Sequence, residues 1–66
     1  MDNRFSQQLQ MLRKQRGLSC KALGELCGLS KNTVAKYERG ERRPSLDALL
    51  AIADFFGVTM DELLGR

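Results

Sequence analysis

Apolar residues recur every three or four positions along most of this 66-residue chain, the spacing that places them on one face of an α-helix. The pattern predicts five helices, with ends good to about three residues. These helices cover residues 3–16, 21–27, 31–39, 46–56 and 60–64. The alternation at period two that is typical of strands is absent, so the sequence predicts an all-α fold, a compact five-helix bundle.

The residues at the predicted helix ends support these boundaries. Glycines at positions 17, 28, 40 and 57 each follow an apolar-periodic segment, as residues that end helices do. Three segments open with an apolar residue, then a hydroxyl residue, then a second apolar residue four positions after the hydroxyl. These triplets are Leu18-Ser19-Leu23, Leu29-Ser30-Val34 and Val58-Thr59-Leu63. In each we expect the hydroxyl to cap free backbone N–H groups while the apolar pair closes over the turn.

The connection between the second and third predicted helices is only two residues long. Cys27 ends one helix and Ser30 caps the next, with Gly28 and Leu29 between them. Because so short a joint cannot return the chain antiparallel, the two helices must cross steeply, as in a helix-turn-helix. Gly24 would let the third helix approach the second closely. We expect Leu23, Leu26 and Cys27 to face inward.

The helix predicted at 31–39 divides into two faces at 100° per residue. Val34 and Tyr37 fall together and are expected to face the core. Glu38 falls at the margin, and the outward face itself contains no carboxylate, unlike an ordinary solvated helix with mixed charges. That outward face comprises Lys31 at its edge, Asn32, Ala35, Lys36 and Arg39.

The chemistry of this face fits the major groove of duplex DNA. An asparagine amide pairs with adenine N6 and N7, and a lysine or arginine donates to guanine O6 and N7. We therefore predict that Lys31, Asn32 and Lys36 read bases. Arg42 and Arg43 follow in a loop suited to gripping phosphates, for which an ordinary solvated turn is the alternative. The free N–H groups at the starts of the second and third helices are further candidates for phosphate binding.

The charge distribution agrees with a polyanionic partner. Residues 1–43 hold ten Lys or Arg and four Asp or Glu, whereas residues 44–66 hold one arginine and four acids. Cys20 and Cys27 are about 10 Å apart on one helix, too far for a disulfide. Without histidine or a phosphate-binding glycine loop, we expect no metal, no cofactor, no small-molecule ligand and no enzymatic activity. No membrane span or secretory signal is apparent, which predicts a cytoplasmic protein associated with the nucleoid.

The segments LRKQRGLS, LGELCGLSKNTVAKYERGERRPS and LLAIADFFGVTMDELL resemble the lambda-repressor/Cro-type helix-turn-helix family, the xenobiotic-response-element type, in order and spacing. The resemblance covers about residues 8–64 of a single domain spanning 1–66, with the helix-turn-helix at about 20–39. It implies sequence-specific binding of double-stranded DNA by a prokaryotic or phage transcriptional regulator, repressor-like and dimeric on a two-fold-symmetric site.

The resemblance also assigns roles to individual residues. In the family, the positions that contact bases correspond here to Lys31, Asn32 and Lys36. Arg13 and Glu38 correspond to a structural ion pair of the family. Several relatives have a DNA-contacting glutamine where this chain has Cys20. This difference makes Lys21 and Lys31 the stronger candidates for contacting DNA in this region. Gly24 is a second departure, because alanine is commoner there. The candidates for backbone or flanking contacts are Cys20, Lys21, Ser30, Thr33, Arg39, Arg42 and Arg43.

An alternative function is a protein-interaction module, such as an antitoxin, on the same scaffold. Met60, Leu63 and Leu64 place three apolar side chains in the short last helix, and we predict that they form a homodimer interface. The alternative for these residues is completion of a small core. The operator sequence, the choice between repression and activation, and the place among phage, restriction-modification, antitoxin and host regulators stay open at this point.

Overall fold

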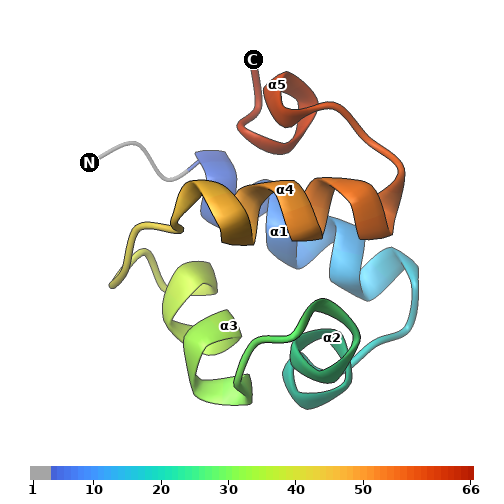
Figure 1. The fold of residues 1–66 in the computed structure, drawn as a ribbon, viewed down its shortest axis with the longest axis vertical. Helices are drawn as coiled ribbons and strands as arrows, with labels where there is room; N and C mark the ends of the chain where they lie inside the picture. The colour runs from blue at the N-terminus through green and yellow to red at the C-terminus, as the bar shows by residue number, and fades with distance from the viewer. Residues whose placement is uncertain (1–3) are drawn as a thin grey trace.

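The computed structural model describes residues 4–66, which form five helices and no strand (Figure 1). The helices are α1 (Arg4–Gln15), α2 (Cys20–Cys27), α3 (Lys31–Glu38), α4 (Leu46–Phe56) and α5 (Met60–Leu63). The prediction of an all-α fold with five helices is confirmed. Every described boundary lies within one residue of the predicted one, and the predicted start at Asn3 lies outside the described residues.

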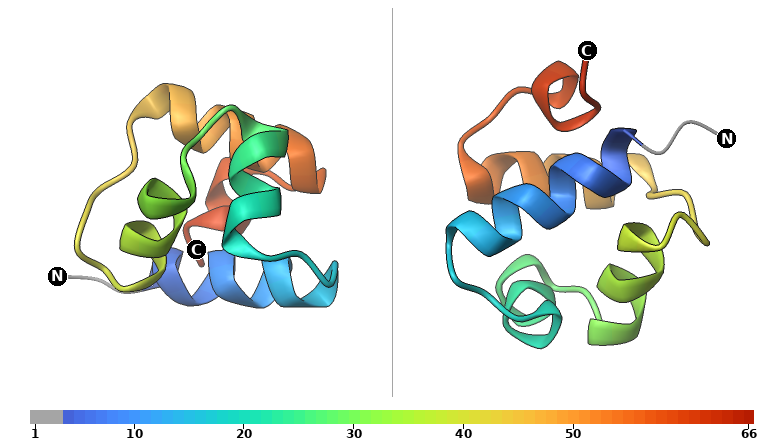
Figure 2. Two further views of the ribbon diagram at one scale, coloured as in Figure 1. Left: turned by 90° about the horizontal axis from the view of Figure 1, so that it is seen from below. Right: turned by 180° about the vertical axis from the view of Figure 1, so that it is seen from behind.

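The helices α1 and α4 cross the middle of the molecule, with α2 and α3 on one side of them and α5 on the other (Figures 1 and 2). Side chains from all five helices meet between them because each helix directs its apolar stripe inward. The fully buried side chains are Leu9, Leu23, Val34, Ile52 and Leu63, one from each helix.

Hydroxyl residues cap four of the helices, at the three positions that the sequence predicts and at Ser45. The Ser19 hydroxyl accepts a hydrogen bond from the Ala22 N–H at 3.0 Å, and Ser30, Ser45 and Thr59 cap α3, α4 and α5 in the same way. The Thr59 hydroxyl also donates to the Glu62 carboxylate at 3.2 Å. Satisfied N–H groups define where each helix starts and thereby hold the short connections in place.

The expectation that Leu26 faces the core is wrong. This side chain is 58% exposed, although the sequence placed it on the inner face of α2. The inner face is centred on Leu23 and Gly24, which are buried. Leu26 lies about 200° around the helix from Gly24 and therefore points away from α3.

The expectation that Leu63 lies in a homodimer interface is also wrong. It is fully buried against the rest of the core, so it has no surface to offer a dimer partner. The reason is its place four residues after the Thr59 cap, where the apolar pair with Val58 closes the turn into the core. Met60 and Leu64 are half-buried and pack against the same core.

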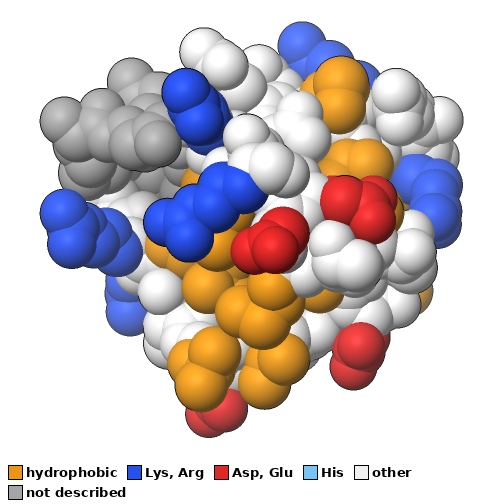
Figure 3. Space-filling view, turned by 90° about the horizontal axis from the view of Figure 1, so that it is seen from above, with side chains coloured by type: hydrophobic (Ala, Val, Ile, Leu, Met, Phe, Trp, Pro, Cys, Tyr) orange, Lys and Arg blue, Asp and Glu red, His pale blue; other side chains and the backbone are white. Residues whose placement is uncertain are grey.

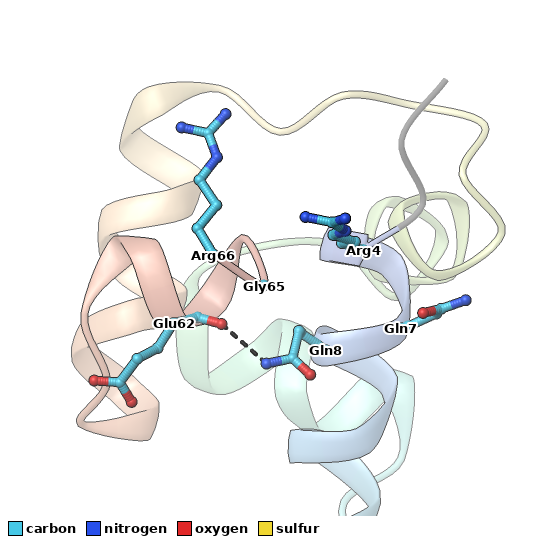
Figure 4. Close-up of a pocket in the computed structure, with 6 residues that line it drawn as sticks. All are labelled: Arg4, Gln7, Gln8, Glu62, Gly65 and Arg66. Carbon is cyan, nitrogen blue, oxygen red and sulfur yellow. Dashed lines mark hydrogen bonds between the residues drawn. The ribbon is translucent and has the colours of Figure 1, made fainter.

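The α5 helix also contacts α1 through polar groups. The Gln8 side-chain amide donates to the Glu62 carbonyl at 3.0 Å, beside a polar depression of about 380 Å³ (Figure 4). Among the described residues, none of the helices has the length and apolar character that crossing a bilayer requires.

Candidate nucleic-acid interface

The corner between α2 and α3 depends on Gly24. A Cβ atom at this position would lie 2.6 Å from the Leu29 carbonyl oxygen, a distance that real Cβ atoms do not tolerate. The Leu29 N–H donates to the Gly24 carbonyl at 2.6 Å, and Gly28 turns the chain with a φ of 73°. The steep crossing predicted from the two-residue joint is present, since α2 is seen end-on where α3 is seen from the side (Figure 1), and Gly24 provides the close approach.

The two faces of α3 separate as predicted. Val34 and Tyr37 are buried, whereas Lys31, Asn32 and Lys36 are exposed. Because the buried stripe fixes how α3 is rotated, the amide and ammonium groups opposite it point away from the protein. Thr33 and Ala35 are half-buried beside them.

The hydroxyl groups at the start of α3 bond to each other. Ser30 Oγ accepts from the Thr33 N–H at 3.1 Å and lies 2.8 Å from Thr33 Oγ1. Ser30 is exposed, as is Lys21 near the start of α2. Two helix starts and their neighbouring side chains thus flank the outward face of α3, where backbone N–H groups favour anions.

An ion pair ties the end of α3 to α1. Arg13 donates from Nε to Glu38 Oε2 at 2.6 Å and from Nη2 to Glu38 Oε1 at 2.9 Å. Its Nη1 group donates to the Leu18 carbonyl at 2.7 Å, so one guanidinium joins three segments of the chain. The hydrogen bonds to Glu38 raise the pKa of Arg13, against the opposing effect of burial. The structural ion pair implied by the family resemblance is present.

Cys20 belongs to this same cluster. Its thiol lies 3.8 Å from Glu38 Oε2 and can donate a weak hydrogen bond to it. Burial and the neighbouring carboxylate together raise the pKa of the Cys20 thiol. The half-buried thiol therefore stays neutral near pH 7 and is directed at Glu38, which leaves it poorly suited to a phosphate contact.

Two further contacts hold α3 from the side of α1. The buried Ser6 hydroxyl donates to the Tyr37 carbonyl at 2.5 Å, and the Phe5 and Tyr37 rings meet edge to face at 5.8 Å. The burial of Ser6 was not predicted, because a serine beside an apolar stripe gives no sign that it will be buried. The last turn of α3 is consequently fixed by both hydrogen bonds and packing.

Glu41 changes the expected charge of the outward surface. Its carboxylate accepts from Arg39 Nε at 2.7 Å and from Arg39 Nη2 at 3.3 Å, and both side chains are more than half exposed. The α3 helix itself has no carboxylate on its outer face, but the chain turns back after it and places one there. Sequence reasoning confined to the helix missed this residue.

Arg42 and Arg43 are exposed in the loop that follows, between α3 and α4. They extend the basic surface beyond the end of α3. The structure therefore leaves most of the predicted nucleic-acid contacts accessible at the surface of the helix-turn-helix and the loop after it, while Cys20 and Arg39 have carboxylate partners within the protein.

Comparisons with known proteins agree with this geometry. A helix-turn-helix family model matches residues 9–63. The transcriptional regulator AnsR of Bacillus subtilis is 53% identical over 55 residues, a match covering 83% of this chain and 47% of AnsR. The chain thus spans about half the length of that curated relative.

Two solved structures superpose closely. The restriction-modification controller protein C.AhdI from Aeromonas hydrophila has a TM-score of 0.84 at 38% identity, with 91% of each chain covered. The P22 c2 repressor protein in complex with synthetic operator 9T has a TM-score of 0.85 at 27% identity, with 89% of each chain covered.

Proposed function

This chain belongs to the lambda-repressor/Cro-type helix-turn-helix family, and from that membership we propose that it regulates transcription by binding a specific site on duplex DNA through α3. The observation that carries the proposal is the exposed outer face of α3, with Lys31, Asn32 and Lys36 opposite the buried Val34 and Tyr37. The P22 c2 repressor, whose structure holds an operator, has the same fold.

In this proposal α3 lies in the major groove, which is wide enough for one helix. The Asn32 amide pairs with an adenine edge, and the Lys31 and Lys36 ammonium groups donate to guanine O6 or N7. Arg42 and Arg43 contact phosphates and set the position of α3 along the duplex. Lys21, Ser30 and Thr33 contribute at the flanking backbone.

We also propose that two copies bind a two-fold-symmetric operator. Half-sites would then lie about 34 Å apart, one turn of the duplex. Leu46 and Leu50, one helical turn apart on α4, are exposed large hydrophobic residues and support a self-association surface together with Met60 and Leu64. Viewed from the α5 side, hydrophobic side chains gather over α4 (Figure 3).

A regulator of this kind acts at the nucleoid in the cytoplasm, and its repressor-like role is a proposal drawn from relatives such as the P22 c2 repressor. The proposed DNA binding is tested by measuring affinity for random-sequence duplex across a salt series. With about three cationic phosphate contacts per copy, from Lys21, Arg42 and Arg43, the logarithm of the affinity should fall linearly with the logarithm of salt, by roughly 0.9 per contact. A flat response would contradict the proposal.

A further inference from the structure

The exposed pair of Arg39 and Glu41 stands on a backbone turn held by hydrogen bonds, and the contacts proposed so far do not use this pair. Arg39 caps the end of α3, where its N–H donates to the Ala35 carbonyl at 3.0 Å. Gly40 has a φ of 71°, and the Glu41 N–H donates to the Lys36 carbonyl at 2.9 Å. This turn returns Glu41 to the side of Arg39 and holds its backbone against the helix.

Glu41 occupies one edge of the Arg39 guanidinium and leaves the other open. The carboxylate takes the edge formed by Nε and Nη2, at 2.7 and 3.3 Å. Within residues 4–66 the Nη1 group of Arg39 donates to no protein atom, so the edge formed by Nη1 and Nη2 stays available. A guanidinium edge of this kind suits a group with two neighbouring acceptors, such as guanine O6 and N7.

The carboxylate adds a second element of recognition. In the major groove a G·C base pair shows two acceptors on guanine beside the N4 donor of cytosine, and carboxylates accept from that donor. Arg39 and Glu41 together offer two donors beside an acceptor, which is the complementary order. Hydrogen bonding from Arg39 lowers the pKa of the Glu41 carboxyl, with a contribution from the Lys36 charge, so Glu41 is ionised near pH 7.

The pair also lies along the face assigned to base reading. Residues 32, 36 and 39 follow one another at helical spacing on the outer side of α3. Asn32 and Arg39 are seven residues apart, about 10 Å along the helix axis, a separation that would bring the two side chains to different base pairs.

We propose that Arg39 and Glu41 act as one unit that reads a G·C base pair in the same half-site as the base pair contacted by Asn32, displaced from it toward the C-terminal end of α3. Arg39 is the specificity-determining residue, and Glu41 is its positioning residue. A phosphate is the other group with two acceptors that Arg39 could meet, but a carboxylate held beside it would repel that anion. The inference rests on the proposed DNA binding.

The test is selection of bound duplexes from a random pool by four proteins, the wild type, Arg39→Lys, Glu41→Gln and Asp54→Asn. Arg39→Lys keeps the charge and loses the two-donor edge. Asp54→Asn, at an exposed position on α4, makes the same change in net charge as Glu41→Gln. We expect the wild type and Asp54→Asn to select a G·C pair at the stated position, and Arg39→Lys and Glu41→Gln to lose at least about fivefold of that preference.

The outcomes separate the two proposals. Wild-type protein that selects no sequence would overturn the proposed sequence-specific binding itself. A wild-type site without the G·C pair, or variants at 39 and 41 that change affinity equally for all sequences, would overturn only the inference and return Arg39 to a phosphate contact. Equal thermal unfolding of the four proteins excludes loss of fold as the cause.

Discussion

The Arg13 guanidinium donates two hydrogen bonds to the Glu38 carboxylate and thereby joins α1 to the last residue of α3. The side chains are 14% and 6% exposed, so each charge depends on the other for solvation. Removing one partner leaves the other charge buried without compensation. The orientation of α3 and the stability of the fold therefore share one contact.

Arg13→Ala should lower the free energy of unfolding by about 3 kcal/mol, because it strands the Glu38 charge and the Leu18 carbonyl together. Urea unfolding followed by circular dichroism measures the change. Arg42→Ala, which removes an exposed arginine, serves as the control and should change stability by less than about 0.5 kcal/mol. Similar losses for the two variants would show that the pair does not stabilise the fold.

Gly24→Ala should destabilise the protein although alanine favours helices over glycine by about 1 kcal/mol. The new Cβ would meet the Leu29 carbonyl at 2.6 Å, and forcing the backbones of α2 and α3 apart should cost about 1–3 kcal/mol. Thermal unfolding beside Glu25→Ala, a substitution at an exposed position of the same helix, gives the comparison. A Gly24→Ala protein more stable than wild type would contradict the close approach.

Stability should decline as pH rises above about 9. Burial raises the pKa of both the Cys20 and Cys27 thiols, so the folded protein holds these protons more tightly than the unfolded chain does. The protonated thiols contribute fully to the free energy of unfolding below the thiol pKa of the unfolded chain. This contribution is lost as pH rises through the thiol pKa values of the folded protein, at most by about 1.4 kcal/mol per pH unit for each thiol. A protein with Cys20→Ser and Cys27→Ser should lose less stability between pH 8 and 10. If the stability of the wild type and of the double variant fell in parallel over this pH range, the raised thiol pKa values would be contradicted.

Asn32→Ala and Arg43→Ala should affect DNA binding differently. Losing the Asn32 amide removes preference at one base pair, by about 1–3 kcal/mol, while binding to random duplex changes little. Losing Arg43 should weaken matched and random duplexes alike and reduce the salt slope by about 1. Competition binding with both duplexes measures the two effects. Equal losses on both duplexes for both variants would refute the division of roles.

Leu50→Lys should weaken self-association if α4 supplies the dimer surface. Met11→Lys is a matched control, because Met11 on α1 is 43% exposed and Leu50 is 44% exposed. Sedimentation velocity with a palindromic duplex should show a two-to-one complex for wild type and Met11→Lys, and weaker assembly for Leu50→Lys. A wild-type protein that stays monomeric on the duplex would exclude the dimer.

Local rules explain why the helices could be predicted closely. Glycines with positive φ follow α2 and α4, and the hydroxyls of Ser19, Ser30 and Thr59 cap α2, α3 and α5, as the sequence indicated. The division of α3 into a buried stripe with Val34 and Tyr37 and an exposed stripe with Asn32 and Lys36 also follows from helical spacing alone.

Contacts across the tertiary structure explain what the sequence did not reveal. Leu26 is exposed because Gly24 occupies the inner face, and Leu63 is buried because the α5 turn folds it inward. Ser6 is buried where α1 packs against α3, and its hydroxyl is satisfied there by the carbonyl of Tyr37, a residue 31 positions away. Glu41 reaches Arg39 through a turn outside the helix, which a helical wheel does not represent.

If α3 binds DNA as proposed, its two stripes make recognition separable from folding. Val34, Tyr37 and Glu38 anchor the helix to the remainder of the protein, whereas substitutions at Lys31, Asn32 or Lys36 leave those anchors untouched. A few substitutions at solvent-exposed residues should therefore be enough to give this chain a new operator preference, without any change to the packing of the domain.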